Sequence, residues 1–167
     1  RGLSLDFDLP QPEIILDDDG RAKDIRRAER GPAHRAVEEA MLAANRTVAQ
    51  ALLDAQQRTI FRVHEKPDAN DLRGISQFYR ALGLVQQGRA GFLDRAGIAK
   101  ALETAKGRPE EAVVHYSTLR AMKQARYSPS CDGHFALGFE AYLHFTSPIR
   151  RYADLLVHRG IRRLLAG

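Results

Sequence analysis

The sequence predicts an α/β (α+β) fold, a mixed sheet with several packed amphipathic helices, in which helices predominate. Three observations support this fold class. Apolar residues recur at helical spacing in several segments, short strand-like runs lie between them, and 44% of the 167 residues are hydrophobic. A chain of this length can bury one core of ordinary size. No apolar run approaches the roughly 18–20 residues of a membrane helix, so we expect no membrane partner.

The first part of the chain predicts β structure. Apolar residues alternate with small or polar ones in the pattern of a half-buried strand, at Leu3, Leu5, Phe7 and Leu9. Residues 13–16 and 21–26 then flank Asp17-Asp18-Asp19-Gly20, which favours a hairpin with a solvated acidic turn. The glycine comes too early for a calcium-binding loop.

The middle of the chain predicts helices. A long one covers residues 32–57, with an apolar side formed by Val37, Ala40, Met41, Ala44, Val48, Ala51 and Leu52. After a short strand at 60–63, Pro67 opens a second helix that Gly83 stops. A short helix contains Ile98 and Leu102. Pro109 starts another helix, whose apolar face carries Ala112, Val113, Tyr116, Leu119 and Met122, and a loop follows at Tyr127-Ser128-Pro129.

The last helix is predicted to start at Ser147 and Pro148, with Ser147 as its N-cap. Its apolar side would contain Ile149, Tyr152, Leu156, Ile161 and Leu164. The free N–H groups of a helix start bind anions, yet Arg150 and Arg151 lie in this first turn, where cations are disfavoured. Two arginines there favour a bound phosphate, which guanidinium groups hold bidentately. The alternative is that Arg150 or Arg151 pairs with a carboxylate such as Asp154.

Charge is distributed unevenly along the chain. The net charge is +5, and residues 120–167 contain 8 Lys or Arg against 3 Asp or Glu, whereas the two signs balance before them. This pattern indicates a polyanionic partner, nucleic acid before an anionic membrane, although a solvated arginine-rich helix face is the alternative. The single cysteine, Cys131, excludes an internal disulfide and favours a reducing compartment, so we expect a cytoplasmic protein.

Other candidate residues lie near the arginines or in the long helix. An aromatic cluster, which either stacks on bases or belongs to the core, consists of Phe135, Phe139, Tyr142 and Phe145. Glu38 and Glu39 adjoin apolar positions of the long helix, so at least one is expected to point inward, unless it pairs with Arg35 or Arg46. We expect His158 to hydrogen-bond to Asp154, one helical turn away.

The run HFTSPIRRYADLLVHR, with GHFALGFEAY before it, resembles the signature of the catalytic (RNB) domain of the ribonuclease II / ribonuclease R exoribonucleases. The stretches LDFDLPQPEIIL, AHRAVEEAMLAAN (33–45) and FRVHEKPD (61–68) resemble the same domain in the same order, closest to its ribonuclease R branch. The resemblance covers residues 1–167, which we therefore expect to be part of such a catalytic domain.

The resemblance implies a hydrolase that degrades single-stranded RNA processively from the 3′ end, releases nucleoside 5′-monophosphates and uses Mg²⁺. Arg150 corresponds to the family's arginine that grips the scissile phosphate, and Glu38 to a glutamate near the 3′-terminal nucleotide. Phe7 corresponds to an aromatic that stacks on the bases. The motif residues expected to line or support the RNA site are His134, Tyr142, Thr146, Ser147 and Arg151.

The chain departs from the family at the metal site. The family's metal-binding aspartates and a catalytic tyrosine precede the matched part, and neither Asp6 and Asp8 nor residues 17–19 replace them. Flanking RNA-binding barrels are also missing. We therefore expect Mg²⁺ ligands outside this chain, a fragment that is inactive alone, and self-association through surface that the missing part would cover. The alternatives are a non-catalytic module that binds RNA 3′ ends, and a helical interaction protein whose arginines bind acidic partners.

Overall fold

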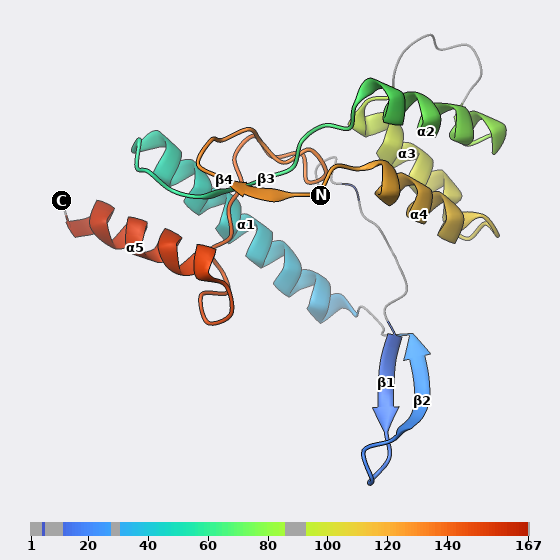
Figure 1. Ribbon diagram of the computed structural model, residues 1–167, viewed down its shortest axis with the longest axis horizontal. Coiled ribbons are helices and arrows are strands. Elements are labelled where there is room, and N and C mark those ends of the chain that lie inside the picture. Colours follow the sequence, from blue (N-terminus) through green and yellow to red (C-terminus); the bar gives the residue numbers. More distant parts are fainter. Residues whose placement is uncertain (1–4, 6–11, 28–30, 86–92, 167) are drawn as a thin grey trace.

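A computed structural model of the chain describes residues 5, 12–27, 31–85 and 93–166. These residues form five helices and two separate two-stranded antiparallel sheets (Figure 1), which confirms the α/β class with helices predominating. The predicted strand at residues 3–9, with Phe7, lies outside the described residues except for Leu5. Leu5 is buried, and its N–H donates to the carbonyl of Ala136 at 2.7 Å.

The predicted hairpin is confirmed. Strand β1 (Pro12–Leu16) pairs with β2 (Ala22–Arg27), and the hairpin extends away from the helices (Figure 1). A carboxylate oxygen of Asp17 accepts hydrogen bonds from the N–H groups of Asp19, at 3.1 Å, and Arg21, at 2.8 Å. The acidic residues therefore build the turn, and Gly20 takes the positive φ (77°) that the turn requires.

Helix α1 (Pro32–Asp54) confirms the predicted long helix but ends three residues earlier. Its buried residues are Asn45, Ala49 and Leu52, whereas Val37 on the predicted apolar side is 61% exposed. The prediction was wrong for the first half of the helix, because no other described element covers that half.

One group of elements packs around α1. Strand β3 (Phe61–Val63), which was predicted, pairs with β4 (Arg126–Ser128), which was predicted as loop. Helix α5 (Tyr152–Ala166) lies beside α1 (Figure 1). The core of this group consists of Ala49, Leu52, Phe61, Val63, Ala141, Leu143 and Val157.

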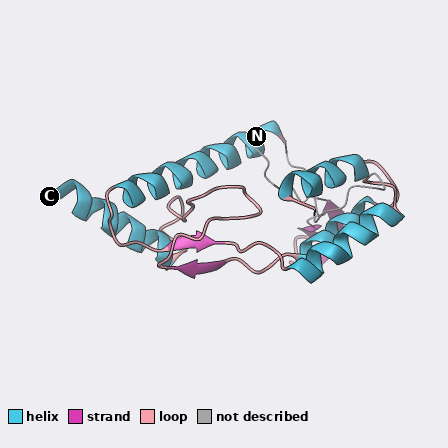
Figure 2. Cartoon of the chain, turned by 90° about the horizontal axis from the view of Figure 1, so that it is seen from above, coloured by secondary structure: helices cyan, strands magenta, loops and turns pink. Residues whose placement is uncertain are grey.

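The second group contains helices α2 (Ala69–Ala81), α3 (Arg95–Ala105) and α4 (Glu111–Ala121), and α4 contacts both of the others. All three were predicted, and α2 begins two residues after Pro67 because Asp68 caps it through the N–H groups of Asn70 and Asp71. Figure 2 shows the two groups at opposite ends of the molecule. The second core consists of Leu5, Leu72, Ile75, Tyr79, Leu84, Ile98, Ala101, Leu102, Ala105 and Val114.

Helix α4 presents a different face to the core from the one predicted. Its buried residues are Val114, His115 and Thr118. The predicted face is exposed, at 56% for Val113 and 61% for Tyr116. The Thr118 hydroxyl donates to the Val114 carbonyl at 2.6 Å and is 2.5 Å from the Tyr79 hydroxyl, and these hydrogen bonds make its burial tolerable.

None of the helices in the described part has the length and apolarity needed to span a bilayer.

Candidate active site

Residues 129–151, which contain most of the predicted site, form no regular helix and lie along the edge of β3 opposite β4. The Arg62 N–H donates to the Tyr142 carbonyl at 2.9 Å, and the His64 N–H donates to the Gly133 carbonyl at 3.0 Å. Gly133 has φ 75°, and a Cβ there would lie 3.1 Å from a backbone oxygen. Backbone hydrogen bonds and one obligatory glycine therefore position this segment.

Asn45 of α1 anchors the middle of the segment. It is 2% exposed, and its amide nitrogen donates to the Tyr142 hydroxyl at 3.1 Å. Its amide oxygen accepts the Phe145 N–H at 2.9 Å. Sequence reasoning gave Asn45 no role, although an amide in the buried stripe of an amphipathic helix signals a partner that it must satisfy.

Asp154 anchors the end of the segment. This side chain is fully buried (0% exposed), and one of its oxygens accepts the Ser147 N–H at 2.8 Å. Arg151 makes two further contacts of 2.8 Å to the carboxylate, through Nε and Nη2. Burial opposes the ionisation of Asp154, but the hydrogen bonds from Arg151 and Ser147 outweigh it and lower the pKa of the carboxyl group.

The prediction that Ser147 is the N-cap of the last helix was wrong. Helix α5 begins at Tyr152, and residues 148–150 form a turn in which the Ser147 carbonyl accepts the N–H groups of Arg150, at 3.3 Å, and Arg151, at 3.1 Å. The predicted apolar side was also wrong at its start, since Ile149 is 102% exposed and Tyr152 is 66% exposed. The buried carboxylate of Asp154 explains this, because it draws the Ser147 N–H into the turn.

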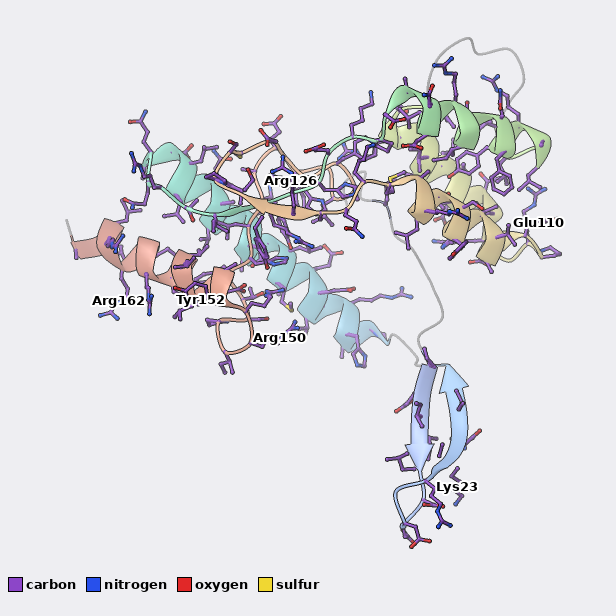
Figure 3. All side chains as sticks on the ribbon, viewed as in Figure 1. Lys23, Glu110, Arg126, Arg150, Tyr152 and Arg162 are labelled. Carbon is purple, nitrogen blue, oxygen red and sulfur yellow. The ribbon has the colours of Figure 1, made fainter. Side chains whose placement is uncertain are left out.

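Arg150 and Arg151 have different environments. Arg151 is half-buried and paired with Asp154, so the carboxylate alternative is correct for it. Arg150 is exposed on the loop before α5 (Figure 3), and its guanidinium makes no ion pair or hydrogen bond with any residue that the structure describes. Arg150 is therefore the arginine available to bind an external anion.

Two histidines line the site as neutral rings. His134 stacks on His64 with centroids 5.0 Å apart and meets Tyr142 edge-on at 5.4 Å. Burial, helped by the nearby charges of His64 and Arg62, lowers the pKa of His134 to about 4. Burial, with Arg151 close by, also lowers the pKa of His144 to about 4. His134 is thus suited to stacking and hydrogen bonding, and not to holding phosphate by charge.

Two hydroxyl groups of the segment differ in their partners. The Tyr142 hydroxyl accepts from Asn45, and burial raises the pKa of this tyrosine. The hydroxyl of Thr146 is buried and has no hydrogen-bond partner among the described residues. Since a buried hydroxyl without a partner is costly, Thr146 has capacity to bind a group from outside the chain.

Glu38 and Glu39 differ in exposure on α1. Glu38 is half-buried and lies two turns before Asn45 on the same side of the helix, whereas Glu39 is exposed. The expectation that one glutamate points inward, and its alternative of an ion pair with Arg35 or Arg46, stay predictions; Glu38 is the less exposed of the two. Its predicted role near the RNA terminus stays a prediction, as does that of Phe7.

The described residues contain no group of three or more His, Cys, Asp or Glu side chains placed to hold a metal ion. The buried carboxylate of the segment, Asp154, is engaged with Arg151. The residues that the structure describes therefore do not fit a Mg²⁺ site.

His158 lies against the segment, but it does not contact Asp154 as predicted. Its Nε2 is 2.9 Å from the Phe145 carbonyl, and its ring stacks on that of Phe145 at 4.3 Å. Phe145 thereby packs against the first core, so this aromatic serves the fold.

The RNB domain family model matches residues 2–167. Ribonuclease R of Aquifex aeolicus is 43% identical over 164 residues, which is 98% of this chain and 23% of that protein. Ribonuclease R of Escherichia coli is 36% identical over 162 residues, or 97% of this chain and 20% of that protein. This chain therefore spans about a fifth to a quarter of the length of these relatives.

The solved structures that resemble the chain include two complexes with RNA. Mycoplasma genitalium RNase R with double-stranded RNA superposes with a TM-score of 0.87 and 29% identity, over 97% of this chain and 29% of that one. The same protein with ribose methylated single-stranded RNA superposes with a TM-score of 0.85 and 30% identity, over 95% of this chain and 25% of that one. Yeast Ssd1, a pseudonuclease, superposes with a TM-score of 0.70 and 23% identity, over 83% of this chain and 17% of that one, which shows a shared fold.

Proposed function

This chain belongs to the RNB domain family, and from that premise we propose that it is part of the catalytic domain of an exoribonuclease. The proposed activity is hydrolysis of single-stranded RNA, processively from the 3′ end, with release of nucleoside 5′-monophosphates. The similarity to proteins named ribonuclease R and to RNase R bound to RNA supports this activity. The observation that carries it is an exposed arginine, Arg150, on a loop that two buried anchors hold in place.

We assign Arg150 to the scissile phosphate. Its guanidinium can donate two parallel hydrogen bonds to phosphate oxygens, and it is not engaged by any described carboxylate. Positioning such a donor before the reaction stabilises the charge that develops in the transition state. Arg151 supports this arrangement through its hydrogen bonds to Asp154, whose carboxylate also accepts the Ser147 N–H. Glu38 is proposed as a second catalytic residue, near the 3′-terminal nucleotide. The proposed lining residues are Phe7, His134, Tyr142, Thr146, Ser147 and Arg151.

Mg²⁺ is proposed as the cofactor of the full-length protein, with ligands outside this chain. The support is the resemblance to the ribonuclease II / ribonuclease R family. We accordingly propose that this chain cleaves RNA poorly by itself. A cytoplasmic location is also proposed, because the lone cysteine, Cys131, suits a reducing compartment.

A non-catalytic module that binds RNA 3′ ends is the alternative. It would use the same arginine and the same aromatic lining. Self-association is expected from the sequence. The exposed apolar face of α4, which includes Val113 and Tyr116, is a surface through which two copies could associate.

Replacing Arg150 with alanine in the full-length protein tests the proposal. We expect kcat to fall roughly a thousandfold while the Kd for RNA, measured without Mg²⁺, changes by less than about threefold, because the contact matters most in the transition state. Arg120→Ala, which removes an exposed arginine from α4, is the matched control and should leave both constants unchanged.

An equal loss in kcat/KM and in RNA affinity would contradict the proposed role of Arg150. A wild-type protein that binds RNA without cleaving it would contradict the enzyme and favour the binding module.

A further inference from the structure

Helix α5 exposes three arginines and a tyrosine along one side. Tyr152, Arg159 and Arg163 are all exposed, and intervals of seven and four residues place them in one line along the helix. Arg162 lies next to this line, and Figure 3 shows Arg150, Tyr152 and Arg162 on the side of α5 away from β3 and β4. We call Tyr152, Arg159, Arg162 and Arg163 the α5 stripe.

Among the described residues, no acidic side chain forms an ion pair with the stripe. The single acidic residue of α5 is Asp154, which is fully buried and paired with Arg151. None of the three arginines of the stripe forms an ion pair within the part of the chain that the structure describes. Two other exposed cations before α5 are paired, Lys123 with Asp68 at 2.9 Å and Arg126 with Glu65 at 2.8 Å. The cationic excess seen in the sequence is therefore concentrated here.

The orientation of α5 is fixed by the opposite face. Val157 is fully buried in the core around α1, and Ile161 packs against that core. A Cβ added to Gly160 would come within 4.0 Å of the Arg58 carbonyl, which shows how closely the helix approaches its neighbour. Because Val157 and Ile161 are held in this core, the middle of the apolar face of α5 is not available to insert into a membrane, as the apolar face of an interfacial helix is.

We propose that the α5 stripe binds the RNA strand next to the nucleotide held at Arg150. This inference rests on the proposed function, because it places the reacting phosphate at Arg150, immediately before the stripe. Arginines grip phosphate oxygens, and an exposed tyrosine provides a stacking surface for one base. From Tyr152 to Arg163 the helix rises about 16 Å, which corresponds to roughly five stacked nucleotides at about 3.4 Å each.

The length of the stripe makes the proposal testable with RNAs of two lengths. The full-length protein carrying Arg159→Gln and Arg163→Gln is compared with wild type by fluorescence anisotropy without Mg²⁺, over a range of salt concentrations. With a single-stranded RNA of roughly twelve nucleotides, the Kd should rise about tenfold, and the slope of log Kd against log salt should fall by about 1.4. With an RNA of about three nucleotides, the Kd should change less than about twofold.

The matched control is Lys100→Gln with Arg120→Gln, which removes two exposed cations from α3 and α4. It should leave both Kd values and the slope unchanged. The proposal is overturned if the double Arg159 and Arg163 variant keeps the wild-type slope, or if the control changes the slope as much. It is also overturned if the variant loses binding only to vesicles containing phosphatidylserine.

Failure of this inference is distinguishable from failure of the proposed function. If the wild-type protein shortens RNA with Mg²⁺ and the double variant keeps the wild-type slope of log Kd against log salt, only the proposed role of the α5 stripe is wrong. If the wild-type protein cleaves no RNA, the proposed enzymatic function is wrong. The placement of the stripe next to a reacting phosphate at Arg150 is then wrong as well.

Discussion

Two neighbouring arginines show, at the scale of single residues, how a partner decides what a side chain can bind. Asp154 is three residues from Arg151 and four from Arg150, so on a helix either arginine could reach it. The sequence left both pairings open for that reason. The structure pairs Arg151, because the chain turns before α5 and leaves Arg150 in the exposed loop.

Asn45 and His64 explain why part of the site could not be predicted. Both are buried polar residues whose partners are distant in sequence: Asn45 contacts Tyr142, 97 residues away, and His64 accepts the Ala136 N–H, 72 residues away. A local pattern contains no information about such pairs. The arginine motif was predictable because its residues are consecutive and chemically unusual for a helix start.

Acidification should destabilise the fold through His134 and His144. In the folded chain the pKa of each is about 4, whereas an unfolded histidine titrates near 6.5. Between these values the unfolded chain binds protons that the folded chain does not, so the free energy of unfolding falls as the pH drops from about 6.5 toward 4. Since both rings are partly exposed, we expect about 1 kcal/mol from each by pH 5, or a Tm lower by roughly 5 °C than at pH 7.5.

Thermal denaturation at the two pH values checks this expectation. His144→Gln should reduce the difference in Tm, and His34→Asn, which replaces an exposed histidine of α1, should leave it unchanged. The carboxyl groups with lowered pKa, such as Asp68 at about 2, titrate below this window. Equal Tm values at both pH values would show that these rings are not held neutral by the fold.

At the scale of elements, helices were predicted well and their faces were not. Every described helix coincides with a predicted one, because helix periodicity, Pro67 and Gly83 are local signals. The predicted orientation of α4 was wrong because apolar residues occur around much of the helix, and because its buried side includes the polar residues His115 and Thr118. Strand β4 was missed because its residues, Arg126–Ser128, include no aliphatic side chain and Pro129 directly follows them, a pattern typical of a loop.

The orientation of α4 predicts opposite effects for two adjacent valines. Val114→Ala should lower the free energy of unfolding by about 2 kcal/mol, because it opens a cavity in a fully buried position. Val113→Ala, at a position 56% exposed, should change it by less than about 0.5 kcal/mol. Urea denaturation of both variants measures this. The reverse order would mean that the face predicted from the sequence is the buried one.

At the scale of the whole molecule, the two cores divide the roles. The core around α1 holds the arginine loop, its anchors and the α5 stripe, and the core of α2, α3 and α4 meets the site near residues 133–136. The sequence predicted the family because its motifs run in order along the chain. It could not predict the packing of the two groups, since that depends on contacts such as Leu5 with Ala136.

The central claim is that this chain belongs to the catalytic domain of a 3′ to 5′ exoribonuclease. The most direct test is a time course with Mg²⁺ on a 5′-labelled single-stranded RNA, for this chain and for the full-length protein. We predict that the full-length protein shortens the RNA stepwise from the 3′ end and releases nucleoside 5′-monophosphates, and that this chain alone cleaves it poorly. A full-length protein that binds the RNA and leaves it uncut would contradict the account.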